Sequence, residues 1–154
     1  MQKTLAKLWC NCTLALLLAA APLALADDTE PVAALLEQLQ STWNAGDMDG
    51  YLALYRGDEE LSLMFGNTVL RGRPAVRALF RKHYPDQEQM GRFAIDTLEV
   101  RLLSADVAIA LGTFTHVFPR ETINGGFSHV LGRAADGSWK IEHEHTSRGS
   151  VTPH

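Results

Sequence analysis

The sequence has 154 residues, with 18 acidic and 14 basic side chains and a formal net charge of −4. A chain of this length suits a single domain, and its acidic balance argues against nucleic acid and anionic membrane surfaces as partners. It contains no glycine-rich phosphate loop, no Gly-x-Ser-x-Gly elbow and no His-Glu-x-x-His motif. Nucleotide hydrolases and the common serine and zinc hydrolases are therefore poor candidates.

The first 26 residues have the pattern of a cleaved secretory signal peptide. Two lysines precede an apolar run over residues 13–21, and residues 24–26 form an A-x-A cleavage signal before Asp27. The apolar run is shorter than the roughly 20 residues that span a bilayer, which argues against a membrane anchor. We therefore expect a periplasmic or secreted domain, residues 27–154, without membrane contact after cleavage. Both cysteines lie in the leader, so this domain has no disulfide and no thiolate.

Helical periodicity predicts three helices in the first half of the mature chain. Residues 31–45 carry apolar side chains at helical spacing, start with a proline and stop before Gly46. Asp47 can cap a second, shorter helix, and residues 71–85 predict a third. The predicted inner stripes are Val32, Leu35, Leu36, Leu39 and Trp43, then Met48, Tyr51, Leu52 and Tyr55, and finally Val76, Leu79, Phe80 and His83.

The second half of the chain is typical of an antiparallel meander, after a short strand within residues 60–67. Four strands are predicted, over residues 92–103, 107–118, 126–133 and 138–146. Turn-forming residues separate them, and the segment after the second of these strands indicates a longer loop. Helices followed by a meander indicate the α+β class, with three N-terminal helices packed on one face of a strongly curved, mainly antiparallel sheet.

Four segments resemble the SnoaL-like group of the nuclear transport factor 2-like superfamily. They are TWNAGDMDGYLALY from Thr42, GRPAVRALF from Gly72, ALGTFTHV from Ala110 and the closing WKIEHEHTS from Trp139. The resemblance spans residues 32–147 and implies a cone-shaped α+β fold, with one apolar pocket and often a dimer through the sheet. It implies no reaction, because the superfamily includes isomerases, cyclases, dehydratases, kinase association domains and plain binding proteins.

The last predicted strand places histidines on an apolar face. Side chains alternate along a strand, so His143 and His145 would lie beside Trp139 and Ile141, with the glutamates pointing away. Counting back through a three-residue hairpin loop then sets three histidines side by side, and a one-residue slip would break this register. The predicted facing pairs are Leu131 with Ile141, His129 with His143, Phe127 with His145, His116 with His129, and Phe114 with Leu131.

Three interpretations of this histidine row stay open. Three imidazoles from neighbouring strands can bind zinc, although the family pattern has aliphatic residues where His116 and His129 stand, and we expect no metal and no cofactor. A neutral imidazole in an apolar pocket can instead transfer protons. The histidines can also be structural, each satisfied by a carbonyl or hydroxyl group, or lie in a dimer interface.

For proton transfer, the closing H-x-H-T-S motif resembles that of the family, which makes His143 and His145 the candidate bases. Such a site also needs a hydrogen-bond donor for a developing enolate oxygen, and Tyr55 is a candidate on a covering helix. Asp96 is a further candidate base. However, apolar residues of the opposite parity precede Asp96, so a bulge in its strand can turn this carboxylate outward.

Large aromatic side chains and a few polar groups are expected to face the same hollow. We hypothesise that the domain binds a small hydrophobic or amphipathic molecule and that it forms a homodimer. The alternatives are an acid–base isomerase, cyclase or lyase, and a dimeric interaction module without a ligand. The expected ligand-binding residues are Trp43, Tyr51, Phe80, His83, Phe114, His116, Phe127, His129 and Trp139.

Overall fold

A computed structural model describes residues 29–57 and 59–154, so the predicted signal peptide lies outside the described residues. Three of its helices and a run of long strands follow the predicted order. A short strand before the third of these helices, a short helix after it and the full length of the last strand were not predicted. The elements are α1 (Glu30–Asn44), α2 (Met48–Ala53), β1 (Ser62–Phe65), β2 (Thr68–Arg71), α3 (Arg73–His83), α4 (Gln87–Met90), β3 (Arg92–Leu102), β4 (Val107–Val117), β5 (Glu121–Arg133) and β6 (Trp139–Pro153).

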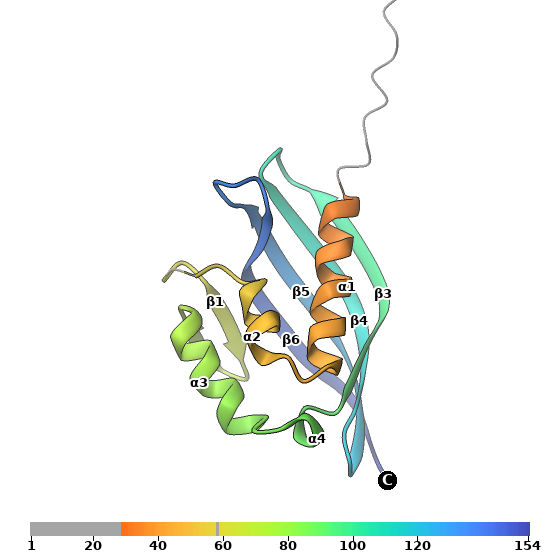
Figure 1. Ribbon diagram of the computed structural model, residues 1–154. Helices are drawn as coiled ribbons and strands as arrows, with labels where there is room; N and C mark the ends of the chain where they lie inside the picture. The colour runs from red at the N-terminus through yellow and green to blue at the C-terminus, as the bar shows by residue number, and fades with distance from the viewer. Residues whose placement is uncertain (1–28, 58) are drawn as a thin grey trace, which may run out of the picture.

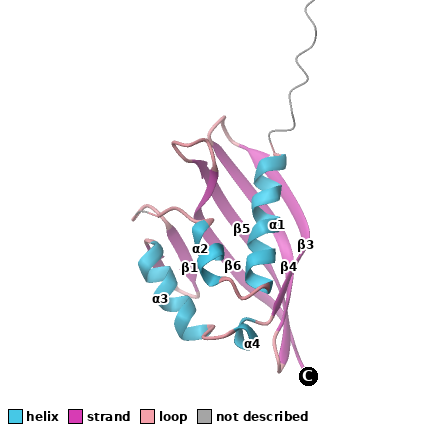
Figure 2. Ribbon diagram, in the orientation of Figure 1, coloured by secondary structure: helices cyan, strands magenta, loops and turns pink. Residues whose placement is uncertain are grey.

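The strands form one six-stranded sheet in the order β2-β1-β6-β5-β4-β3. Every neighbouring pair is antiparallel except β1 and β6, which run parallel. Helices α1, α2 and α3 lie over one face of this sheet (Figure 1), and Figure 2 shows the two layers by type of element. The predicted α+β class is confirmed. The segment predicted as a loop before residue 126 belongs to β5, which begins at Glu121.

Helix α1 buries one complete stripe against the sheet. The five apolar residues that the periodicity predicted for its inner side are all buried, and burial of this kind stabilises a fold by about 25 cal/mol per Å² of apolar surface. The helix ends where Gly46 adopts a positive φ of 72°, a conformation that glycine reaches without steric cost. Asp47 caps α2 as predicted, because its carboxylate accepts a hydrogen bond from the Gly50 amide at 2.8 Å.

Side chains of α1 also pair with β3, the strand at one edge of the sheet. The Asn44 amide donates to the Phe93 carbonyl at 2.8 Å and accepts from the Phe93 amide at 2.8 Å. One turn earlier, Gln40 Oε1 accepts from the Ile95 amide at 2.7 Å. These amide side chains form the hydrogen bonds with the β3 backbone that a neighbouring strand would otherwise form.

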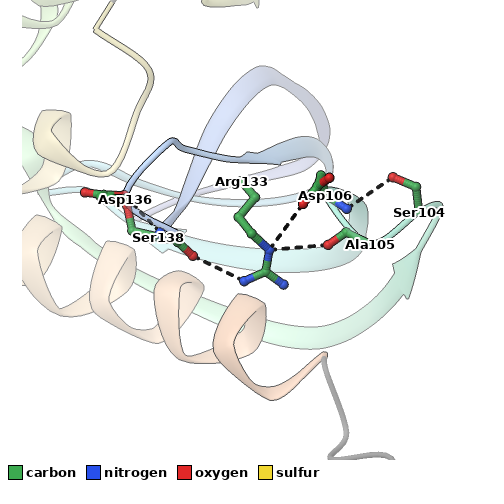
Figure 3. A network of polar contacts seen from close by, with 7 residues as sticks. Ser104, Ala105, Asp106, Arg133, Asp136 and Ser138 are labelled. Atoms are coloured by element: carbon green, nitrogen blue, oxygen red, sulfur yellow. Dashed lines mark hydrogen bonds and ion pairs between the residues drawn. The ribbon is translucent and has the colours of Figure 1, made fainter.

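At the end of the sheet that carries the β3–β4 and β5–β6 turns, Arg133 joins the two turns (Figure 3). Its Nε donates to the Ala105 carbonyl at 3.3 Å and lies 3.6 Å from Asp106, and its Nη1 donates to the Gly137 carbonyl at 3.2 Å. The guanidinium also lies over the ring of Trp139, 4.5 Å from its centroid. The predicted three-residue hairpin loop is confirmed by the Ala134–Ser138 hydrogen bond that closes it.

A β-bulge in β6 overturns the predicted histidine row. Leu131 faces Ile141 as predicted, but Val130 faces His143, so Glu142 is an extra residue in β6. The alternation beyond it is therefore shifted, and Glu144 is buried while His145 is exposed. The carboxylate of Glu142 lies over Gly132, where a Cβ atom would be 2.0 Å from Oε1, and pairs with Arg56 at 3.1 Å.

The remaining predicted pairs are wrong for the same reason or because the β4–β5 turn is tighter than expected. Backbone bonding between Phe118 and Glu121 closes that turn, which moves β5 along β4. The observed partners are Glu144 for His129, Thr146 for Phe127, Ile123 for His116 and Gly125 for Phe114. The histidines 116, 129 and 143 are therefore not opposed across neighbouring strands.

A second bulge decides the orientation of Asp96. Ile95 faces Phe114 and Thr97 faces Thr113, so Asp96 is the extra residue of β3. Its side chain is exposed and its carboxylate accepts a hydrogen bond from the Thr115 hydroxyl at 2.8 Å. Phe93 and Ile95, apolar residues at alternate positions before Asp96, had indicated that this carboxylate could point outward.

Candidate functional site

A cavity of about 80 Å³ lies between the helices and the sheet, and its lining comes from the start of β3, the end of β4 and the middle of β5 and β6, away from the turns that Arg133 joins. Six of the predicted ligand-binding residues line it: Trp43, Tyr51, Phe80, His116, Phe127 and His129. The other lining residues are Leu39, Leu63, Phe65, Tyr84, Phe93, Ile95, Glu144 and Thr146. The wall is thus mainly apolar and aromatic, with a small number of polar groups, which is the usual composition of a small-molecule site.

The other predicted site residues lie elsewhere. Phe114, His83 and His145 line a wider groove beside the cavity. Trp139 is buried under Arg133 at the far end of the sheet. His143 lies on β6 beside the bulge, with Nδ1 at 2.8 Å from the Ser62 hydroxyl, and Asp96 faces outward. The structure therefore brings neither His143 nor Asp96 to the cavity.

Glu144 is the buried carboxyl group of the cavity, with 7 % of its surface exposed. Tyr55 donates a hydrogen bond from its hydroxyl to Oε2 of Glu144, and the hydroxyls of Tyr51 and Tyr55 are 2.7 Å apart. A phenol has one proton, so Tyr51 donates to Tyr55 whenever Tyr55 donates to Glu144. Tyr51 lies on α2, whereas Tyr55 follows the end of that helix, contrary to the expectation, and forms a parallel bridge with Ile141 of β6.

Burial determines the ionisation of this chain of groups. It raises the pKa of Glu144 from 4.5 to about 7, against the opposing effect of the Tyr55 hydrogen bond. Burial, followed by the charge of Glu144, raises the pKa of both tyrosines well above 10.0. The phenols therefore remain protonated donors, whereas Glu144 populates both protonation states near neutral pH.

His129 is the second buried polar group beside Glu144. Its Nε2 lies 3.9 Å from Oε2 of Glu144, and its ring stacks on Phe127 at a centroid distance of 5.0 Å. Burial lowers the pKa of His129 from 6.5 to about 3, so the imidazole is neutral and the contact is not an ion pair. Its Nδ1 is buried without a hydrogen-bond partner, at a typical cost of about 1–3 kcal/mol.

His116, by contrast, is satisfied by the fold. Its Nε2 lies 2.6 Å from the Met90 carbonyl oxygen, which also accepts a hydrogen bond from the Trp43 indole at 2.9 Å. Burial lowers the pKa of His116, and the bond to Met90 opposes this shift. The structural interpretation offered for the histidines therefore describes His116, which ties α1, α4 and β4 together.

The sequence did not identify Glu144, because strict alternation along β6 placed it outside. It also missed Phe93 and Ile95 in the lining. One signal was available for these two residues, since their parity along the strand is opposite to that of Asp96. No comparable signal marks the bulge at Glu142, apart from Gly132 on the facing strand, which leaves room for a carboxylate.

Two kinds of feature are absent from the described residues. Within residues 29–57 and 59–154, no group of three or more His, Cys, Asp or Glu side chains is placed to hold a metal ion. No helix in that part of the chain is long and apolar enough to cross a membrane.

The helical layer, the bent sheet and the cavity between them together define a protein of the nuclear transport factor 2-like class. The chain belongs to the family of SnoaL-like domains, which it matches over residues 32–151. No curated protein matches the sequence.

Solved structures of the same class support this assignment. An NTF-2 like protein of unknown function from Shewanella oneidensis is 29% identical, with a TM-score of 0.73 over 77% of this chain and 98% of that chain. A putative calcium/calmodulin dependent protein kinase II association domain from Xanthomonas campestris is 24% identical, with a TM-score of 0.66 over 84% and 93%. A ketosteroid isomerase-like protein from Erwinia carotovora is 20% identical, with a TM-score of 0.65 over 80% and 98%. The last two show the fold alone.

Proposed function

We propose that this domain binds a small, mainly apolar molecule that carries one uncharged polar group. The observation that carries the proposal is the mainly apolar and aromatic wall of the cavity, which is interrupted by two buried polar side chains, Glu144 and His129, with Oε2 and Nε2 3.9 Å apart. A hydroxyl or carbonyl group on the ligand would bind these polar groups, and the surrounding rings would hold the apolar part. A cofactor is not required for this role.

The size of the cavity limits what it can enclose. A single water molecule needs at least about 10–15 Å³ of such space, so about 80 Å³ admits a group of several heavy atoms. Glu144 and the hydroxyl oxygen of Tyr51 supply acceptors at its polar wall, and the neutral imidazole of His129 has one N–H to donate. The site is therefore suited to the polar end of a ligand rather than to a polycyclic molecule as a whole.

Native mass spectrometry of the untagged protein tests the proposal directly. Thr146 is exposed and lines the cavity, so Thr146→Phe should block entry and lower ligand occupancy by at least about tenfold. Thr152→Phe, on the exposed end of the same strand, is the matched control and should keep the ligand. Unchanged occupancy in Thr146→Phe would show that the ligand lies elsewhere, and an empty wild-type protein would favour the interaction module.

Acid–base catalysis is the second candidate function, and one observation favours it. Burial brings the pKa of Glu144 to about 7, so this carboxyl group can accept and return a proton at neutral pH. Glu144 then takes the role that the sequence suggested for His143, His145 or Asp96. Once it has accepted a proton it can donate to Tyr55, which then donates to Tyr51, so that the Tyr51 hydroxyl becomes free to donate to the substrate. Incubation of the co-purified ligand in deuterated water tests this role. Deuterium should enter the ligand with the wild-type protein and not with Glu144→Gln, and no incorporation in either contradicts it.

We also propose that the chain is exported, cleaved after Ala26 and dimeric. Ala110 is buried under the helices, so its neighbours Ile109 and Leu111 point to the other face, where Ile109 pairs with Val130. These half-buried apolar residues suit a contact with a second copy. The N-terminal sequence of the periplasmic protein tests the cleavage. Sedimentation of wild type and Leu111→Lys tests the dimer, which should dissociate in the variant.

A further inference from the structure

A wider groove of about 1050 Å³ adjoins the cavity. The ends of α3 and α4, the last residues of β1, the β4–β5 turn and the second half of β6 surround it. Phe65, Tyr84 and Thr146 line both the cavity and the groove, so the two spaces adjoin at these three residues. A ligand whose polar end fills the cavity therefore extends into this groove.

The groove differs from the cavity in its charged side chains. Arg120 and Arg148 line it together with Glu88 and Glu121. The guanidinium of Arg148 lies 3.7 Å from Oε1 of Glu121, and their side chains are 66% and 35% exposed. An exposed pair at this distance contributes at most about 1 kcal/mol, so a ligand group can compete with Glu121 for Arg148.

Among the charged residues of the groove, Arg148 also acts electrostatically on two residues of the cavity wall. Its positive charge opposes the rise that burial causes in the pKa of Tyr84, and it adds to the fall that burial causes in the pKa of His116. Both residues line the cavity. The electrostatic field at the junction of the two spaces therefore favours a negative charge on the outer part of a ligand.

We propose that the site takes an elongated amphipathic carboxylate, whose uncharged polar end lies in the cavity beside Glu144 and His129 and whose carboxylate binds Arg148 in the groove. This inference rests on the proposed binding function and adds the chemical class of the ligand. An arginine and a carboxylate can form two parallel hydrogen bonds, whereas Glu121 forms one loose contact with Arg148. Arg120 supplies a second positive charge on the same groove.

Calorimetric titration with three matched compounds tests the proposal. They are ω-hydroxyoctanoate, the corresponding diol and the corresponding amino alcohol, which share a hydroxyl end and an apolar chain and differ in the charge of the other end. We expect the carboxylate to bind at least about tenfold more tightly than the diol, with the preference declining as salt is added. Arg148→Gln should remove the preference and leave the affinity for the diol unchanged.

Arg101→Gln is the matched control, because Arg101 is an exposed arginine on β3 that lines neither space, and it should retain the preference. Equal affinity of wild type for the carboxylate and the diol overturns this inference and leaves the proposed binding function standing. Tightest binding of the amino alcohol overturns it in favour of Glu88 and Glu121. If none of the three compounds binds, the inference and the proposed function both fail.

Discussion

The two ends of the sheet each contain a buried nitrogen without a hydrogen-bond partner, yet their surroundings differ. At the turn end, Trp139 Nε1 is buried in a residue that lines neither the cavity nor the groove, on the strand that also carries the fully buried Ile141. At the other end, His129 Nδ1 belongs to a residue that lines an 80 Å³ space beside a buried carboxyl group.

The comparison teaches that an unsatisfied polar atom indicates a ligand only where there is space for one. The face of the Trp139 ring makes a favourable contact with the Arg133 guanidinium. The unpaired N–H of the indole is a cost of this packing. His129 has no such contact, although it stacks on Phe127. The turn end is therefore closely packed, whereas the other end keeps a cavity lined by aromatic and polar side chains.

Truncation of apolar side chains should produce the largest effect and separate the two ends. Ile141→Ala removes a fully buried side chain from the packed end and should lower the free energy of unfolding by about 4 kcal/mol. Leu39→Ala, beside the existing cavity, should cost about 2 kcal/mol, because that side chain already has fewer neighbours. Urea unfolding measures both values, and equal losses would contradict a looser cavity end.

The pH dependence of stability should give the next largest effect. Between pH 4.5 and 6.5, folded Glu144 holds a proton that the unfolded chain has released, so this group makes stability fall as pH rises. Folded His129 lacks a proton that the unfolded chain binds over the same interval, so it makes stability rise. Each slope is about 1.4 kcal/mol per pH unit and the two cancel in the wild type.

Single substitutions should reveal these opposed slopes. Relative to wild type, Glu144→Gln should become more stable as pH rises from 4.5 to 6.5, and His129→Asn should become less stable. The double variant should follow the wild-type profile, which controls for all other titrating groups. Urea unfolding at successive pH values measures the slopes, and parallel profiles for all four proteins would show that neither group is kept neutral by burial.

Substitutions outside the cavity should have the smallest effect. His143→Ala and Asp96→Asn change side chains that do not line the cavity, so each should alter stability by less than about 0.5 kcal/mol and leave ligand occupancy unchanged. Unfolding curves and native mass spectra check the two expectations. Loss of ligand in His143→Ala would move the functional site to the outer side of β6.

The helices and the class of fold could be predicted because they depend on local signals. Periodicity identified all five buried residues of α1, and Asp47 identified the start of α2. Three aromatic residues of the cavity wall followed from the same stripes, since Trp43, Tyr51 and Phe80 each lie on the inner side of a helix.

The composition of the polar wall could not be predicted, because it depends on register. A single extra residue at Glu142 exchanges the faces of everything beyond it in β6, so Glu144 enters the cavity and His145 leaves it. The bulge is stabilised by tertiary contacts, with Arg56 from the segment after α2 and Gly132 from β5. Neither contact is visible in the local sequence of β6.

The pairing of Gln40 and Asn44 with β3 has a consequence for solubility. An open strand at the rim of a sheet can recruit extended segments of other chains and begin fibril growth. Here two amide side chains of a helix act as a substitute for a seventh strand and already occupy the Phe93 and Ile95 positions of that rim. The helix therefore shields the molecule from intermolecular zippering along this border, while its Leu39 and Trp43 side chains also form part of the cavity wall.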